Sequence, residues 1–297
     1  MDPPNVLWFG GTYALALASY GLISTIPTSH DSVWVFLAAI AFLLAYSTAS
    51  WILLRRGWWV PGGLTAALAA GMTPAVGVSF LQLIDVWPSD FPLTDFNGCA
   101  VAVAVLTAIA GLIAYALTRF SFIFVVVLSA VIVTAQLLAV AGGGASGDDR
   151  ATAALLAGGL IVIVGVFLDA FGRRRDAFWF HVIGWFSAAA GLVFFTIEPS
   201  GDPNRGWIPM LIVGTLMVIA AAPIRRATWA VYGVLGYYAP IVHYLQQGLN
   251  DNGWPFALAL LGLAVGIFVT GMLLYRYGKE WGDRFVRRLP PGVAPTP

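Results

Sequence analysis

Residues 33–64 read VWVFLAAIAFLLAYSTASWILLRRGWWVPGGL, and this stretch decides the fold. The run 33–54 is apolar and long enough to cross a bilayer as a helix, which takes roughly 20 residues. It ends at Arg55 and Arg56, and Trp58 and Trp59 follow, as is typical of a chain at the membrane–water interface. A second apolar run begins at residue 60. The stretch therefore predicts two transmembrane helices joined by a short basic turn.

The same pattern recurs along the 297 residues, of which 60% are hydrophobic and 10% charged, with a mean hydropathy of +0.85. Soluble domains carry about a quarter charged residues. We expect an all-α, polytopic transmembrane helix bundle forming a single domain over residues 1–275, followed by a short basic tail over 276–297 that ends in a Pro-rich segment. The predicted spans number ten and are 5–25, 33–54, 60–84, 98–118, 121–141, 151–171, 177–197, 207–223, 228–248 and 254–275.

The basic residues orient this bundle. If the ten spans are crossed in order, 13 of the 15 lysines and arginines fall on the side of the N-terminus, and only Arg150 and Arg205 fall on the other. Cytoplasmic loops carry the excess of Lys and Arg. The acidic residues run the opposite way, so the net charge is +8 inside and −7 outside. One missed helix would move every later loop to the wrong side, so the asymmetry supports ten spans with both termini cytoplasmic.

Several functions are excluded or disfavoured by what the spans and loops contain. No loop is long enough for a nucleotide-binding domain, and the only lysine, Lys279, follows the last span, which removes a retinal Schiff base. His181 and His243 differ by roughly 15 Å in predicted depth, too far for one haem iron or a shared zinc. No paired carboxylates, Ser/His arrangement or metal cluster marks an enzyme. We predict no cofactor and no nucleic-acid partner.

One carboxylate lies near the inner end of a span. Asp169 precedes Arg173 by four residues, a spacing that favours a salt bridge on one helix face. We interpret it as an interfacial ion pair that supports a helix end.

Polar residues gather instead in the outer half of three spans that point outward. They are Gln82 and Asp85 in the third span, Gln136 in the fifth, and His243 and Gln247 in the ninth. Helix kinks are predicted at Pro74 in the third span and at Pro240 in the ninth. Kinked helices leave carbonyls for a cavity or a neighbour. We predict that the five polar residues face one outward-opening cavity. Asp85 and the acidic outer face favour a cationic or hydrogen-bonding solute. The alternative is that each residue forms a separate interhelical hydrogen bond.

Two resemblances accompany this pattern. Ten spans with both ends inside resemble the gross shape of the drug/metabolite transporter superfamily, although the prolines and polar residues do not follow its five-plus-five repeat. Residues 57–64 (GWWVPGGL), 175–179 (RDAFW) and the run from Arg225 to Tyr237 are similar to a family of bacterial multipass inner-membrane proteins of unknown function. That likeness, together with the preference for Arg over Lys, implies a bacterial cytoplasmic membrane.

Three functions remain open on the sequence. The first is a small-molecule transporter or channel with an outward-facing polar pocket. The second is a non-catalytic subunit or assembly partner of a larger membrane complex, or a homo-oligomer, that uses small-residue faces such as Gly158, Gly159 and Gly165. The third is a membrane-embedded enzyme acting on lipid. Solute, oligomeric state and complex membership are not encoded in any motif.

Overall fold

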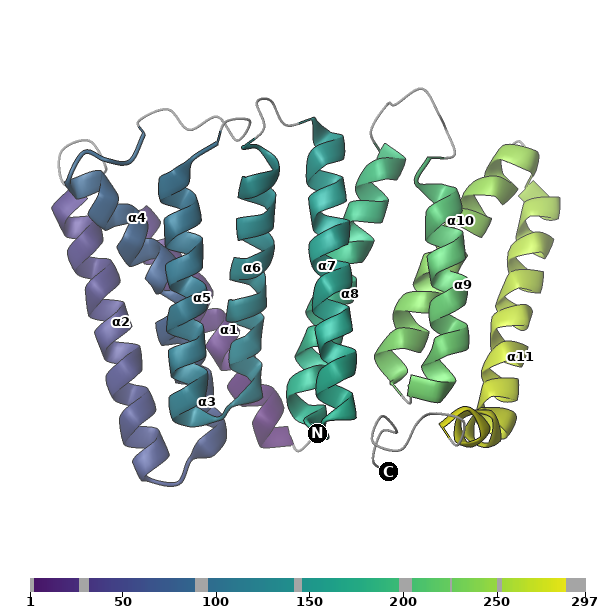
Figure 1. Ribbon diagram of the computed structural model, residues 1–297, viewed down its shortest axis with the longest axis horizontal. Coiled ribbons are helices and arrows are strands. Elements are labelled where there is room, and N and C mark those ends of the chain that lie inside the picture. The colour runs from purple at the N-terminus through teal and green to yellow at the C-terminus, as the bar shows by residue number, and fades with distance from the viewer. Residues whose placement is uncertain are drawn as a thin grey trace. The chain divides into compact units, whose positions relative to one another are not determined.

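The computed structural model describes residues 3–26, 32–88, 96–141, 146–197, 205–224, 226–249 and 253–286. Within these ranges the regular structure is helical, without a strand (Figure 1). The last residues of the predicted tail, 287–297, lie outside the described residues. The all-helical fold class is therefore confirmed for the described part of the chain.

The chain forms two compact units, Met1–Ala153 and Ala154–Pro297, which we describe separately as unit 1 and unit 2. Unit 1 contains α1 (Pro3–Ser24), α2 (Ser32–Arg55), α3 (Trp59–Gly71), α4 (Thr73–Leu83), α5 (Gly98–Thr118), the short 3-10 helix η1 (Ser121–Ile123) and α6 (Phe124–Ala139). Helix α7 (Gly147–Ala170) begins in unit 1 and lies mainly in unit 2. Unit 2 continues with α8 (Arg174–Ile197), α9 (Trp207–Ile224), α10 (Ala227–Leu249) and α11 (Gly253–Val286).

Each of the ten predicted segments coincides with helical structure. Among the described residues, eight helical segments are long and apolar enough to cross a membrane. Helix α9 is apolar but shorter, over Trp207–Ala221, and α10 is not among the eight, so the number of ten spans stays a prediction. Many large side chains on these helices are exposed, among them Leu117 at 79%, Phe268 at 68% and Leu156 at 67%. Single-chain soluble proteins rarely expose such large apolar surfaces. The chain is thus consistent with a multipass membrane protein.

The third predicted span is not one helix but two, separated at Met72. The Met72 side chain is 1% exposed, and Pro74 is the second residue of α4. Proline has no N–H to continue the ladder of the preceding helix. The carbonyl of Gly71, the last residue of α3, accepts a hydrogen bond from the Tyr20 hydroxyl of α1 at 2.5 Å. The break therefore ties α1 to the centre of the third span. Pro240, in contrast, lies inside α10 and is buried.

A tight turn at Gly172 positions the inner end of α7. Gly172 has a φ of +76°, in the left-handed region that glycine adopts without strain. Its N–H donates to the Asp169 carbonyl at 3.0 Å, and the Arg173 N–H donates to Leu168 at 2.9 Å. This pair of bonds is the pattern of a Schellman C-cap. The cap stops α7 at Ala170, one residue after Asp169, and the chain enters α8 at Arg174.

Glycines bring two helix pairs of unit 2 into backbone contact. A Cβ at Gly158 of α7 would lie 2.5 Å from both the Ala188 nitrogen and the Gly184 carbonyl oxygen of α8. A Cβ at Gly214 of α9 would lie 2.5 Å from backbone atoms of Gly236 and Tyr237 on α10. Small residues permit this close approach in membrane helices. The pairs α7–α8 and α9–α10 are therefore the closely packed parts of unit 2.

Candidate functional site

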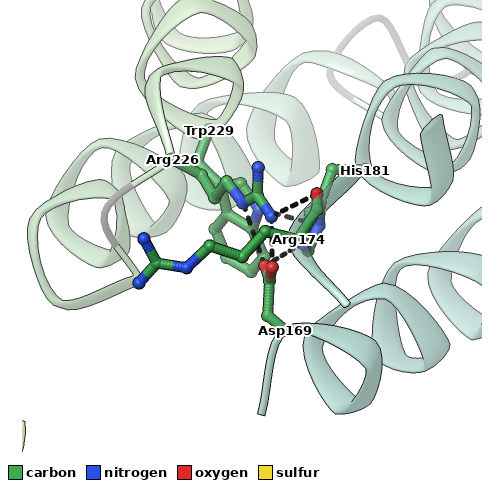
Figure 2. A network of polar contacts seen from close by, with 5 residues as sticks. All are labelled: Asp169, Arg174, His181, Arg226 and Trp229. Atoms are coloured by element: carbon green, nitrogen blue, oxygen red, sulfur yellow. Dashed lines mark hydrogen bonds and ion pairs between the residues drawn. The ribbon is translucent and has the colours of Figure 1, made fainter. Parts of the chain in front are cut away.

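A polar cluster lies at the end of α7 and the beginnings of α8 and α10 (Figure 2). Its centre is the Asp169 carboxylate, in the last turn of α7. Oδ2 lies 2.8 Å from Nε2 of His181 on α8 and accepts the Nε–H of Arg226 at 3.0 Å. Oδ1 accepts a second bond from the Arg226 guanidinium. Arg226 therefore binds the carboxylate with two nitrogens, the geometry in which Arg–carboxylate pairs are strongest.

His181 is fully buried, at 0% exposure, and both of its ring nitrogens are occupied. Nδ1 lies 3.1 Å from Nε1 of Trp229, on the first turn of α10. An indole N–H is only a donor, so Nδ1 must be the acceptor and carries no proton. The proton of the neutral ring then sits on Nε2 and is donated to Asp169. The contacts thus assign His181 as a neutral imidazole in the Nε2–H tautomer.

Arg226 and Trp229 enter the cluster together from the segment that begins α10. The Arg226 guanidinium also donates to the backbone carbonyl of Arg174 at 2.8 Å, which fixes it to the first residue of α8. Its side chain is 17% exposed and that of Asp169 is 11% exposed. One four-residue segment therefore supplies both the positive charge and the indole donor to a carboxylate–imidazole pair held by α7 and α8.

The structure gives Asp169 a different principal partner from the one that helix spacing favoured. Arg226 lies 57 positions along the chain, beyond the reach of any periodicity argument. Arg173, the residue suggested by the four-residue spacing, donates through Nε and a terminal nitrogen to Oδ2 of Asp176 at 2.9 and 2.7 Å. Asp169 is still an ion-paired residue at a helix end, but it joins three helices instead of supporting one.

The charges of the cluster balance. Asp169 contributes one negative charge and Arg226 one positive charge, while His181 is neutral by its hydrogen bonds. Charges removed from water must be paired to be tolerated. Chemically, this arrangement presents a carboxylate and an imidazole that could hold a proton between them. Within the described residues, no three His, Cys, Asp or Glu side chains gather closely enough to hold a metal ion.

The five residues predicted to share an outer cavity belong to different units, so their convergence stays a prediction. In unit 1, Gln82 and Asp85 are exposed at the end of α4, and Asp85 has a φ of +54°. Gln136 of α6 donates through Nε2 to the Arg150 carbonyl at 3.0 Å, joining α6 to the start of α7. None of these three side chains bonds to another of the three in the described structure.

In unit 2 the remaining two residues are brought together. His243 and Gln247 are one turn apart on α10, with the Gln247 Nε2 3.0 Å from His243 Nε2. The His243 ring also stacks on Trp207, the first residue of α9, at a centroid distance of 4.2 Å. His243 follows Trp229 by fourteen residues, about 21 Å along a helix axis. His181 of α8 contacts α10 at Trp229, so the two histidines lie at different positions along the axis of α10.

Unit 1 contains an apolar cavity of about 610 Å³ beside the break between α3 and α4. Gly71 and Pro74 line it at the break, and α1, α5 and α6 supply its other walls. Its few polar groups are the Tyr20 hydroxyl, Thr107 and Ser129, and Trp87 lines it two residues after Asp85. A volume of several hundred Å³ with few polar groups is typical of small-molecule sites. Sequence reasoning located the proline but not this cavity.

Comparison with protein-family models, with curated proteins and with solved structures returned no match for the chain.

Proposed function

We propose that this protein is a multipass membrane transporter that carries a small, largely apolar solute with a positive charge or a hydrogen-bonding group. The observation that carries the proposal is the cavity of about 610 Å³ at the helix break around Met72. Transporters commonly form substrate sites where discontinuous helices leave backbone groups near the middle of the membrane. Here the break interrupts the third predicted span near its midpoint.

The lining supports the chemical class of the solute. Most lining residues are aliphatic, such as Val103, Val126 and Leu137, so the body of the solute would be apolar. The Tyr20 hydroxyl donates to the Gly71 carbonyl, so at the break these two oxygens offer their remaining lone pairs as acceptors for a donor on the solute. Asp85 follows α4 and is two residues from Trp87, so a carboxylate lies near one end of the cavity in sequence. A carboxylate there favours a cation over an anion.

The proposal includes ten spans, cytoplasmic termini and a bacterial inner membrane. The basic asymmetry of the loops and the helical structure of all ten segments support this topology. We propose that five polar residues lie toward the outer side and contact the solute before it enters the cavity: Gln82, Asp85, Gln136, His243 and Gln247.

A lipophilic cation tests the proposal directly. Purified full-length protein would be reconstituted into vesicles, and uptake of radiolabelled tetraphenylphosphonium measured in excess of that by protein-free vesicles, because this cation also crosses bare bilayers. Ala104→Phe places a ring in the cavity, because Ala104 lines it and is 6% exposed. Ala102→Phe is the matched control, since Ala102 is exposed on the same helix and is not among the lining residues.

We expect saturable uptake by the wild type and by Ala102→Phe, and loss of uptake in Ala104→Phe and Asp85→Asn. Asp85→Asn provides a second variant because Asp85 is exposed and its replacement leaves the helix core untouched. Equal uptake by all four proteins would reject the cavity as the path. The second function considered above, a non-catalytic subunit or assembly partner, would instead be indicated by no uptake and constant co-purification of other membrane polypeptides.

A further inference from the structure

Two residues at the start of α10 contact the Asp169–His181 pair: Arg226, directly before the helix, and Trp229 in its first turn. Arg226 binds the carboxylate and Trp229 donates to His181 Nδ1, while Asp169 and His181 themselves belong to α7 and α8. Figure 2 shows the carboxylate facing both the imidazole and the guanidinium. Any displacement of the first turn of α10 would therefore remove the cation and the indole donor in one step.

We propose that Asp169 and His181 form a proton-binding site in which a proton and the Arg226–Trp229 segment replace each other. With the segment in place, Arg226 neutralises Asp169 and the indole N–H occupies the lone pair of Nδ1. With the segment displaced, the carboxylate has no guanidinium and Nδ1 has a free lone pair. A proton taken from water by Nδ1 then gives an imidazolium that stays bonded to Asp169.

Charge balance prevents the added proton and the Arg226–Trp229 segment from occupying the site at the same time. A protonated His181 beside Asp169 and Arg226 would leave a net positive charge among largely buried groups, which is unfavourable. It would also oppose an Nδ1–H to the indole N–H, leaving two donors facing each other without an acceptor. Each state with a single cation, either the guanidinium or the imidazolium, has a net charge of zero.

The remaining charged groups near His181 do not replace Arg226. Arg173 is paired with Asp176 at the start of α8, and the side chains of Arg174 and Arg175 are exposed there. From α10 the Tyr232 hydroxyl donates to the Val182 carbonyl at 3.3 Å. Helix α9, which also packs against α8, carries no titratable residue between Trp207 and Ile224. Asp169 is thus the carboxylate that would hold the proton at His181.

In the proposed transporter the proton would be the coupling ion, and only this role of the proton rests on the proposed function. A transporter can use such exclusion to couple a proton to a conformational change, because only the state that has released the segment can bind the proton. Proton binding itself can be measured without a transport assay, so the two proposals fail separately.

Nitrogen NMR on histidine-labelled protein provides the test, since the chain contains 3 histidines, His30, His181 and His243. The full-length protein would be labelled with ¹⁵N-histidine in detergent micelles, and the His181 signals assigned by their loss in His181→Gln. Chemical shifts of Nδ1 and Nε2 distinguish the two neutral tautomers from the imidazolium. Titration would compare the wild type with Arg226→Gln and with Arg175→Gln, which removes an exposed arginine from the same end of α8.

We expect wild-type His181 to stay in the Nε2–H tautomer at neutral pH. In Arg226→Gln the midpoint of His181 protonation should rise by at least about one pH unit, a tenfold gain in proton affinity. Arg175→Gln should titrate like the wild type. Identical midpoints in the wild type and Arg226→Gln, or an imidazolium at neutral pH in the wild type, would overturn the proposal.

Trp229→Phe keeps every charge and provides a second test if Arg226→Gln does not fold. It removes only the indole donor, so the His181 midpoint should move in the same direction by a smaller amount. An unchanged or lowered midpoint in Trp229→Phe would also reject the exchange. If His181 behaves as expected but vesicles show no uptake, the proton site remains and the transporter is rejected.

Discussion

Trp229 donates its indole N–H to Nδ1 of His181 across 3.1 Å, and this one bond determines the tautomer of a fully buried histidine. The donor comes from α10 and the acceptor from α8, so the protonation state of the ring depends on how these two helices meet. Asp169 fixes the opposite nitrogen from α7. Three helices therefore determine where a single proton resides.

Replacing Trp229 with phenylalanine should destabilise the protein more than the same change at Trp185. Trp229→Phe leaves Nδ1 of His181 without a donor in a buried site, which costs about 1–3 kcal/mol. Trp185 packs edge-to-face on Trp229 at 5.1 Å, but its Nε1 has no hydrogen-bond partner among the described residues. Unfolding of both variants in detergent would measure the difference. Equal losses would mean that packing, and not the hydrogen bond, holds Trp229.

Arg226 should contribute more stability than Arg173, although each pairs with an aspartate in the same region. The Arg226 side chain is 17% exposed and that of Arg173 is 46% exposed. Removing one partner of a largely buried pair costs about 3 kcal/mol. The Asp176 side chain is 10% exposed, but its partner Arg173 is half-exposed, and screening of the arginine by water makes the contribution of that pair smaller. Free energies of unfolding for Arg226→Gln and Arg173→Gln at pH 8 would test this order. A larger loss in Arg173→Gln would contradict it.

The free energy of unfolding lost in Arg226→Gln should become smaller as the pH falls. Without the guanidinium, the folded variant is expected to bind a proton at His181 more tightly than the unfolded chain does. Because stability rises as pH falls wherever the folded state binds more protons, the variant gains stability on acidification. The wild type, in which Arg226 remains paired with Asp169, should not show this gain. Unfolding measured from pH 8 to 5 for both proteins checks the prediction, and parallel curves would refute it.

Replacing glycine with alanine should lower the stability of the protein at Gly158 but not at the neighbouring Gly159. Gly158→Ala would force backbone atoms of α8 away, since the new Cβ would lie 2.5 Å from Ala188 and Gly184. Overpacking of this kind typically costs about 1–3 kcal/mol. A Cβ at Gly159 would have no atom of the described residues within 4 Å, so Gly159→Ala should be neutral or slightly stabilising. Thermal unfolding of the two variants is the measurement, and similar melting temperatures would argue against the close approach.

Cys99 provides a direct test of the proposed topology. It lies near the start of α5 and is partly exposed, which the ten-span arrangement assigns to the outer surface. A membrane-impermeant maleimide should label Cys99 in intact cells. An introduced Arg175→Cys in a Cys99→Ser background should react only after the membrane is opened. Labelling of Cys99 only in opened vesicles would reverse the orientation or change the number of spans.

The helices could be predicted closely from the sequence because apolar length is a local property. The fourth predicted span, 98–118, coincides with α5, and the segments 33–54 and 207–223 end within one residue of α2 and α9. The third span differs because Pro74 breaks it into α3 and α4 at Met72, a division that hydropathy alone does not mark. At the other end of the chain, α11 continues to Val286, eleven residues beyond the predicted span.

The polar cluster was harder to predict because its contacts are not periodic. Spacing directed attention from Asp169 to Arg173, whereas the structure brings in Arg226 from the turn before α10. One signal was available: Asp169, His181 and Arg226 all lie near the ends of predicted spans that meet the inner surface. Depth was used to group the outer polar residues, and the same criterion, applied to the inner ends of the spans, would have grouped these three. Rotation about the helix axes, which the sequence does not specify, decided which of them met.

The glycine contacts also limit how unit 2 can move. Within each antiparallel hairpin, α7–α8 and α9–α10, backbone touches backbone at Gly158 and Gly214, so sliding inside a hairpin meets a steric barrier. Between the hairpins, the cluster joins the start of α10 to the ends of α7 and α8 through side chains. A conformational change within unit 2 is therefore easiest as a rigid-body rotation of one hairpin away from the other. The contacts of Arg226 and Trp229 are the ones that such a rotation would break.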